Sequence, residues 1–328
     1  MKVIYSNCLG SFVFDKKVED SILFKREDAV QRCLQLEKEE IIEEEQKLLK
    51  KHPDALFLNK KSDEKIRQLD DSKKIREILS NFTKDGPKYF ETELILAKNK
   101  IKKSVKFDNL VMNCIGSIEE INKTINLFSR RLRVWYELHN PEVSRKIADN
   151  VKFAQVITEK RREELLKEIK VKKEESMGAD LEEKDIKQIL FLADEIIKLN
   201  ELKENDEKYL EEVMKKNCPN LHAIAGTLIG AKLISLAGSF HHLSELPAST
   251  VQLLGAEKAF FRHIKTGSKT PKHGVIVQHY LVQNSKNKGK ASRVLADKIS
   301  IAVKIDFFKG EFIGDKLLKE VEKKLAGG

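Results

Sequence analysis

Hydrophobic residues recur at alternating spacings of three and four between residues 118 and 135. The positions are Ile118, Ile121, Ile125, Phe128, Leu132 and Trp135. This spacing places all six on one face of a helix, and its seven-residue repeat is typical of a coiled-coil seam. Ser117 and Glu120 have the spacing of a capping box, so we expect the helix to begin there.

A second set of apolar positions predicts partners for this helix. Asn140 and Pro141 interrupt the seam as a cap and a first-turn proline, so a new helix is expected after them. Its apolar face would carry Val143, Ile147, Val151 and Ala154. A turn at Ser176–Asp180, with Asp180 as the expected cap, leads into a further helix. That helix repeats Ile186, Leu190, Ala193, Ile197 and Asn200, which predicts an antiparallel coiled-coil hairpin over residues 116–215.

Strand and helix patterns alternate in residues 1–115, which predicts an α/β domain. Strands are expected at Lys2–Ser6, Ser11–Phe14, Ser21–Phe24 and Ala55–Leu58, with a hairpin turn at residues 7–10. One helical run is expected from Ala29 to Leu49.

The last segment, residues 216–328, has only helical periodicity. Its most apolar run, Leu221–Gly238, is interrupted by Lys232 and contains several glycines, so a buried helix is favoured over a membrane span. With 328 residues the chain has room for two or three domains. The fold class predicted for the chain is α+β multidomain, in which an N-terminal α/β domain and a coiled-coil hairpin precede an all-α C-terminal domain.

The net charge of +10 is concentrated in this C-terminal segment. From Lys215 to the end there are 19 Lys and Arg against 8 Asp and Glu, whereas the preceding 214 residues hold 43 and 44. A domain with a strong positive excess is suited to bind a polyanion.

One expected helix, Ala256–Ile264, and its continuation carry part of that charge. Lys258, Arg262 and Lys265 share one face, Phe260 and Ile264 fall on the opposite face, and Phe261 flanks the basic stripe. Such a helix can bury its apolar side and present its cations to phosphates, with Phe261 free to stack on a base. A solvated amphipathic helix without a ligand is the alternative reading.

Two basic segments follow and are expected to be loops near the same ligand. The first contains Lys269, Lys272 and His273, and the second contains Lys288 and Lys290 just before Arg293, which we expect to begin a helix. Lys286 is taken as a solvated side chain.

Several segments of the chain resemble the Nop family, the core proteins of box C/D RNA-guided methylation particles, which have a related spliceosomal member. The resemblance rests most on Gly255–Arg262, which reads GAEKAFFR. The other matching segments are Arg131–His139, Ser176–Gly178, Cys218–Leu221, Ala225–Ile234, Pro271–Ile276 and Gly289–Ala296. Phe260 and Lys288 stand where the family often has Leu and Arg. The chain lacks the long lysine-rich tail of many family members, and in this respect it resembles the archaeal branch of the family.

The resemblance implies a scaffold with three binding functions. Residues 1–115 would dock the methyltransferase fibrillarin, residues 116–215 would form a homodimer through the coiled coil, and residues 216–328 would be the Nop domain. The Nop domain would bind box C/D guide RNA together with a small ribosomal-protein-like protein that recognises kink-turns. The expected RNA-binding residues are Gly255, Ala256, Glu257, Lys258, Phe261, Arg262, Lys265, Lys269, Lys272, His273, Lys288, Lys290 and Arg293.

We do not expect catalysis by this chain, because it has no glycine-rich nucleotide loop and no nucleophile motif. S-adenosylmethionine is expected only on fibrillarin, no metal on His222, His241 or His242, and no membrane partner. The four cysteines have no C-x-x-C spacing and are interpreted as reduced core thiols. The expected location is the cytoplasm of an archaeal cell. A splicing-type Nop scaffold, a coiled-coil tether without RNA and an RNA-modifying enzyme remain as alternatives.

Overall fold

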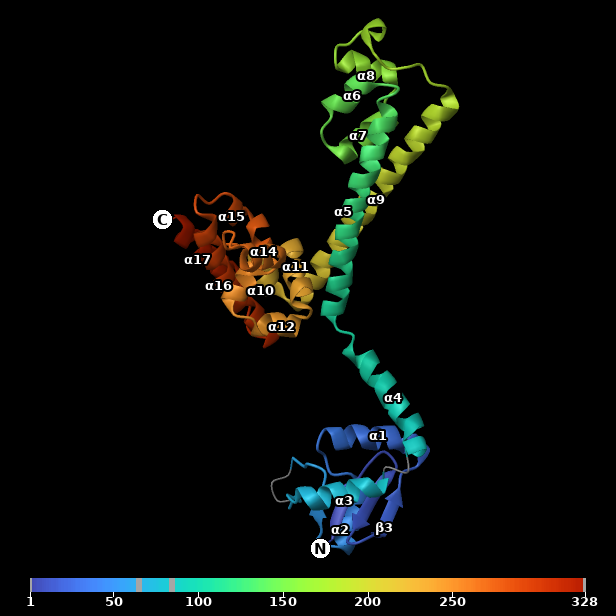
Figure 1. The fold of residues 1–328 in the computed structure, drawn as a ribbon, viewed down its shortest axis with the longest axis vertical. Coiled ribbons are helices and arrows are strands. Elements are labelled where there is room, and N and C mark those ends of the chain that lie inside the picture. Colours follow the sequence, from blue (N-terminus) through green and yellow to red (C-terminus); the bar gives the residue numbers. More distant parts are fainter. Residues whose placement is uncertain (1, 63–66, 83–85, 327–328) are drawn as a thin grey trace. The chain divides into compact units, whose positions relative to one another are not determined.

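The computed structural model describes residues 2–62, 67–82 and 86–326. It divides into two compact units, Met1–Val105 and Lys106–Gly328 (Figure 1). The division falls before the expected boundary at residue 115, because the first long helix of the second unit already begins at Phe107.

Unit 1 contains a four-stranded sheet with helices on both faces. Its elements are β1 (Val3–Ser6), β2 (Gly10–Phe14), β3 (Val18–Leu23), α1 (Arg26–Glu37), α2 (Glu43–Lys51), β4 (Leu56–Phe57), α3 (Ser72–Phe82) and α4 (Gly86–Ser104). The strand order is β3-β2-β1-β4, with β1 antiparallel to β2, β2 antiparallel to β3, and β1 parallel to β4. The α/β character predicted for this region is therefore present.

Alternation along the strands explains why both faces of the sheet are covered. Val3 and Phe14 pack with Ile78 of α3, whereas their chain neighbours Ile4 and Val13 pack with Leu48 of α2.

The single helix expected from Ala29 to Leu49 is instead two helices, α1 and α2. The chain turns between them at Glu39, which has a φ of 60°. The turn lets Glu45, in the first turn of α2, point into unit 1.

Glu45 forms a buried ion pair with Lys61. Lys61 Nζ lies 2.5 Å from Glu45 Oε2, and both side chains are fully buried. Lys61 also donates to the carbonyl of Glu40 at 2.9 Å, and Glu45 accepts a hydrogen bond from Ser6 Oγ at 2.7 Å. Each charge is thus paired and further hydrogen-bonded, which is the condition under which a buried pair is tolerated.

Unit 2 begins with the expected antiparallel hairpin. Its two long helices are α5 (Phe107–Tyr136) and α9 (Glu183–Asn217), and between them lie α6 (Pro141–Lys146), α7 (Asn150–Glu159), α8 (Arg162–Glu168) and the 3-10 turn η2 (Lys173–Glu175) (Figure 1). The seam is largely as predicted: Ile118, Ile121, Ile125 and Leu132 are buried, although Phe128 is only partly covered.

Three details of the hairpin differ from the expectation. Ser117 does not cap α5 but lies within it, and its hydroxyl donates to Asp206 of α9 at 2.9 Å. Trp135 is 45% exposed, and Tyr136, four residues after Leu132, takes the buried place. The helix α9 begins at Glu183 without an Asp180 cap, because Asp180 is paired with Arg162 at 2.8 Å.

The remaining helices form an all-α body on the open end of the hairpin (Figure 1). They are α10 (Pro219–Ala225), α11 (Thr227–Ala237), α12 (Phe240–Glu245), α13 (Ala248–Leu253), α14 (Glu257–Thr266), η3 (Val275–Gln278), α15 (Tyr280–Gln283), α16 (Lys288–Phe307) and α17 (Gly314–Ala326). One hydrophobic core joins this body to the hairpin, since it includes Val111 of α5 and Met214 of α9 beside Leu295 of α16.

The apolar run Leu221–Gly238 forms two helices rather than one. The chain bends between α10 and α11 at Gly226, where φ is 75°. Among the described helices, none has both the length and the apolar character of a membrane span, and α10 and α11 reach that criterion only as a pair bent by 114°.

We predict that Lys61→Met destabilises unit 1 by about 3–5 kcal/mol, because it leaves the Glu45 carboxylate buried without a countercharge. Hydrogen exchange of the β1 and β2 amides measures this loss. Lys60→Met is the matched control, because Lys60 is 75% exposed and pairs with Glu39 at the surface. Equal effects of the two substitutions would contradict the assignment.

His279 predicts a pH dependence of unit 2. Its ring accepts a hydrogen bond from the Leu281 amide at 3.3 Å, and burial lowers its pKa below the ordinary 6.5, although a hydrogen bond to the backbone of Ile224 opposes this shift. A lowered folded-state pKa gives stability that is present above pH 6.5 and lost as pH falls. Urea unfolding at pH 7.5 and pH 5.5 should show a smaller loss for His279→Gln than for the unchanged protein. An equal loss would show that His279 is not responsible.

Candidate nucleic-acid interface

A groove of about 750 Å³ lies beside the N-terminus of α16 and contains four of the expected RNA-binding residues. Lys269, Lys272, Lys290 and Arg293 line it, together with Ser249, Gln252, Leu253, Thr270, Pro271, Asn287, Gly289 and Val294. No carboxylate is among these lining residues, and all four cations are exposed. The groove therefore presents positive charge without compensation from its own walls.

Backbone pairing brings the loop of Lys269 and Lys272 to this position. The Gly274 amide donates to the Gln252 carbonyl at 2.7 Å, and the Val275 amide donates to the Leu254 carbonyl at the same distance. The Gln252 side chain donates to the Lys272 carbonyl at 2.5 Å. A Cβ at Gly274 would lie 1.9 Å from the Leu254 carbonyl oxygen, so this close approach requires glycine.

The segment expected as a second basic loop is instead the first turn of α16. Asn287 is the N-cap, and its side-chain oxygen accepts a hydrogen bond from the Lys290 amide at 3.0 Å. Lys288, Gly289 and Lys290 are therefore helical, and Arg293 lies one turn further along rather than at the helix start. The N-terminus of a helix carries partial positive charge and free N–H groups, which adds to the attraction for anions.

Helix α14 lies in a segment that departs from the all-α body at Gly255 and rejoins it at Gly274. Gly255 has a φ of 86°, and its amide donates to the Glu257 side chain at 2.7 Å. Near the end of α14, the ring of His263 contacts the Ser268 carbonyl and lies 3.1 Å from the Thr270 hydroxyl. These contacts connect the helix to the loop that lines the groove.

We expected the apolar face of α14 to be buried, but it is exposed. Among the described side chains of α14 none is buried, and Phe260, Phe261 and Ile264 are 40%, 68% and 65% exposed. The periodicity correctly separates the apolar face from the cations, but within the described part of the chain that face remains exposed. Helix α14 therefore presents both an apolar surface and exposed cations.

The thirteen expected residues fall into three groups. Lys269, Lys272, Lys290 and Arg293 meet in the groove, with Lys288 on the adjoining first turn of α16 and His273 half-buried in the loop. Lys258, Phe261, Arg262 and Lys265 are exposed on α14, outside the groove lining. Gly255, Ala256 and Glu257 shape the start of that helix.

Four polar groove residues are not among the expected RNA-binding residues: Ser249, Gln252, Thr270 and Asn287. The N-cap pattern of Asn287 could have been recognised, because Asn is a preferred cap. Ser249 and Gln252 have no distinguishing pattern.

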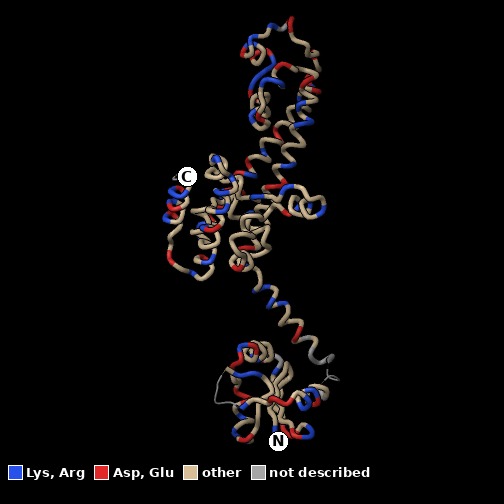
Figure 2. Tube along the Cα trace, turned by 60° about the vertical axis from the view of Figure 1, so that its left-hand side comes forward, with Lys and Arg blue, Asp and Glu red and all other residues tan. Residues whose placement is uncertain are grey.

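Lysines of the hairpin differ from those of the groove. Figure 2 shows basic and acidic residues interleaved along this part of the chain. Lys187 pairs with Glu183 at 2.9 Å, Lys198 with Glu195 at 2.8 Å, and Lys215 with Glu211 at 2.6 Å. Within the described residues, no such ion pair involves a groove cation. These hairpin lysines are neutralised by carboxylates, whereas the groove cations are available to a ligand.

The histidines do not gather into a metal site in the described part of the chain. His241 and His242 both lie near Glu245, at 3.8 and 3.6 Å, on exposed turns of α12. His222 is on α10 and has a pKa lowered mainly by burial.

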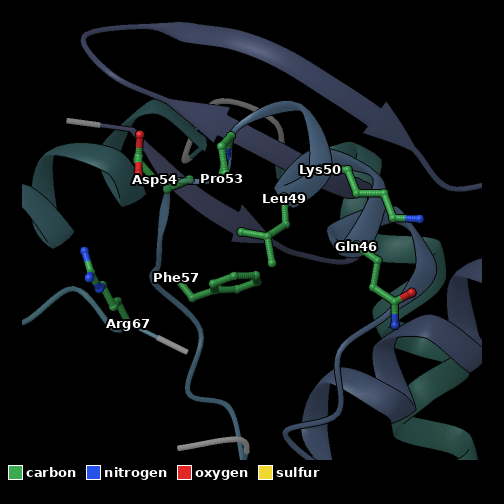
Figure 3. A pocket seen from close by; sticks show the side chains of 8 residues that line it. Gln46, Leu49, Lys50, Pro53, Asp54, Phe57 and Arg67 are labelled. Atoms are coloured by element: carbon green, nitrogen blue, oxygen red, sulfur yellow. The ribbon is translucent and has the colours of Figure 1, made fainter. Parts of the chain in front are cut away.

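Unit 1 has a separate pocket of about 620 Å³ between α2 and β4 (Figure 3). Leu49, Pro53 and Phe57 supply apolar surface, and Lys50, Asp54 and Arg67 supply charges of both signs. Because its charges are of both signs, this pocket lacks the excess positive charge that attracts a polyanion.

Comparison with known proteins defines the class of this helical protein with its coiled-coil hairpin and basic groove. Residues 117–327 match the family model Nop, described as "snoRNA binding domain, fibrillarin". The chain belongs to the Nop family. It is 37% identical over 254 residues to an uncharacterized NOP5 family protein of Methanocaldococcus jannaschii, covering 72% of this chain and 61% of that one.

Eukaryotic relatives show similar identities. Nucleolar protein 56 of Dictyostelium discoideum is 40% identical over 260 residues, covering 71% of this chain and 48% of that one. Nucleolar protein 58 of Schizosaccharomyces pombe is 39% identical over 228 residues, covering 64% and 45%. The chain thus spans about half the length of these relatives. A solved structure titled as a fibrillarin/Nop5p complex is 22% identical, with a TM-score of 0.44 and 99% of both chains covered.

We predict that Phe260→Ala lowers the free energy of unfolding by much less than the roughly 3–5 kcal/mol of a buried aromatic truncation, because the side chain is 40% exposed. Chemical denaturation of unit 2 measures the difference. Phe240→Ala is the control, because Phe240 is 5% exposed and lies in the core. Equal losses would show that the face of α14 is covered.

Proposed function

We propose that this chain is a non-catalytic scaffold of a box C/D RNA-guided ribose methylation particle. The observation that carries the proposal is the groove of four unpaired cations beside the α16 N-terminus, in a chain of the Nop family. Guide RNA would bind along this groove, and the scaffold would hold fibrillarin in reach of the target ribose.

The groove is suited to a nucleic-acid backbone. Lysine and arginine neutralise phosphates and release bound counterions, which makes affinity depend on salt. Arg293 has the planar guanidinium that can contact one phosphate through two hydrogen bonds, whereas Lys272 and Lys290 act as point charges. Because Gln252 fixes the Lys272 backbone and Asn287 caps α16, the cations sit on an ordered frame.

Helix α14 would extend this interface to a protein partner. Its cations Lys258 and Arg262 can meet phosphates, and its exposed Phe260 and Ile264 need an apolar cover. A kink-turn RNA already bound by its small ribosomal-protein-like partner offers both surfaces. We therefore propose that α14 binds where RNA and that protein meet.

The hairpin would join two copies of the chain. Its outer surface exposes large apolar side chains that the seam does not use, among them Leu127 and Val134 of α5 and Phe191 and Leu202 of α9. Leu127 and Val134 are seven residues apart, so they share one helix face. A second hairpin would cover such stripes, as in coiled-coil association.

Unit 1 would bind fibrillarin, which would supply the S-adenosylmethionine and the catalytic residues. The family resemblance supports this role, and the mixed pocket of α2 and β4 is one surface on which it can be tested.

The RNA-binding role predicts a change in salt dependence. Arg293→Ala should weaken binding of the full chain to a kink-turn RNA carrying its small protein, and reduce the slope of log affinity against log salt by about one. Arg262→Ala should do the same if α14 contacts a phosphate. Fluorescence anisotropy at several salt concentrations gives both values.

Lys198→Ala is the control for these titrations, since Lys198 is already paired with Glu195 on the hairpin. It should leave affinity and slope unchanged. If Arg293→Ala binds like this control, the groove is not the RNA site.

For the dimer, we predict that Phe191→Asp halves the mass measured by sedimentation at micromolar concentration, to that of one 37.7 kDa chain. A charge in an apolar interface would be left desolvated. Phe308→Asp, at a 77% exposed site outside the hairpin, should remain dimeric. Monomeric unchanged protein would refute self-association.

A further inference from the structure

A second cavity in unit 1, of about 480 Å³, contains two cysteines that are 25 residues apart in the chain. Cys8 belongs to the turn between β1 and β2, and Cys33 belongs to α1. Its other lining residues are Tyr5, Ser6, Asn7, Leu36, Glu37, Asn59, Leu79, Glu93 and Leu96. The expectation that all four cysteines are core thiols is therefore wrong for Cys8, which is only half-buried.

The turn between β1 and β2 holds Cys8 in place. The Asn7 side chain accepts a hydrogen bond from the Leu9 amide at 2.9 Å, and the Asn7 amide donates to the Gly10 carbonyl at 3.0 Å. The Phe24 amide donates to the Leu9 carbonyl at 2.8 Å, which joins the turn to the end of β3. In this arrangement the side chains of Cys8 and Cys33 line one cavity, where the two thiols interact.

The two thiols have unequal surroundings. The hydrogen bond from Cys33 lowers the pKa of Cys8, and the nearby Lys100 acts in the same direction against burial, Glu93 and Glu37. Cys33 is 5% exposed, and donation to Cys8 together with burial raises its pKa. Cys8 is thus the more accessible sulfur and the better thiolate, which is the form that reacts.

We propose that Cys8 and Cys33 form a modification site in which a hydroperoxide converts the two thiols into a reversible disulfide. The Cys8 thiolate attacks one peroxide oxygen, the O–O bond breaks, and a sulfenic acid forms while water leaves after protonation. The sulfur of Cys33 then attacks the sulfenic sulfur, its proton leaves with the hydroxyl as a second water, and the S–S bond closes. The two thiols are oxidised by two electrons, and one hydrogen peroxide is reduced to two waters.

The other two cysteines provide an internal comparison. Burial raises the pKa of Cys114 to about 11 and that of Cys218 to about 12. Their sulfur atoms lie against the Asp206 carbonyl and the Met214 sulfur rather than against a second thiol. Neither is expected to react under conditions that oxidise Cys8.

The test uses the full-length reduced chain and hydrogen peroxide at a dose that fully oxidises glutathione. After free thiols are alkylated, mass spectrometry should show a chain with two alkyl groups instead of four. Peptide mapping should show a linked peptide pair containing Cys8 and Cys33, and alkylated Cys114 and Cys218. Dithiothreitol should restore four alkylated cysteines. In Cys33→Ser, dimedone should trap a sulfenic acid on Cys8.

Two results would overturn the proposal. One is alkylation of both Cys8 and Cys33 after peroxide treatment of the unchanged protein. The other is a Cys8 disulfide between two chains, seen on a non-reducing gel, in place of the internal link. Both results are read on the unchanged protein and do not depend on whether a variant folds.

Discussion

Cations that share one groove repel one another, and the proposed RNA binding depends on this concentration of like charge. Lys269, Lys272, Lys290 and Arg293 surround a space that contains no carboxylate of this chain. Backbone pairing between Gly274 and Gln252 of α13 holds the loop in place in spite of that repulsion. A protein that keeps like charges together at a cost in stability gains an attraction for anions, and RNA phosphates are the anions that the Nop family assignment indicates.

The chain treats its charges differently in its different parts. In unit 1 the buried Lys61 is matched by Glu45 and by the Glu40 carbonyl, so the pair serves the fold. On the hairpin, Lys187, Lys198 and Lys215 are each neutralised by a carboxylate one turn away, and exposed apolar side chains form stripes beside them. On the all-α body Lys298 is paired with Glu320, but the groove cations have no ion pair within the described residues. Helix α14 leaves its apolar face exposed. The proposed binding surfaces are therefore those where cations have no countercharge or apolar side chains remain uncovered.

The periodicity of apolar residues predicted where helices form better than it predicted which of their faces are covered by other elements. The buried Ile118, Ile121, Ile125 and Leu132 follow from spacing alone, since a seam needs only its own two helices. Phe260 shows the limit: spacing defines a face but does not show whether another element covers it. The two basic segments were expected near one ligand. The α13 residues that complete the groove and the Cys8–Cys33 pair were not predicted, because each contact joins segments distant in sequence. The turn at Glu39 was missed because good helix formers surround it.

Photocrosslinking of the assembled complex, followed by mass spectrometry of the attached nucleotides, can decide whether RNA binds in the groove. If it does, guide RNA attaches to peptides from residues 249–293, including the loop of Lys269 and Lys272 and the first turns of α16. Attachment confined to unit 1 or to the hairpin would contradict it, because those parts of the chain do not contain the groove.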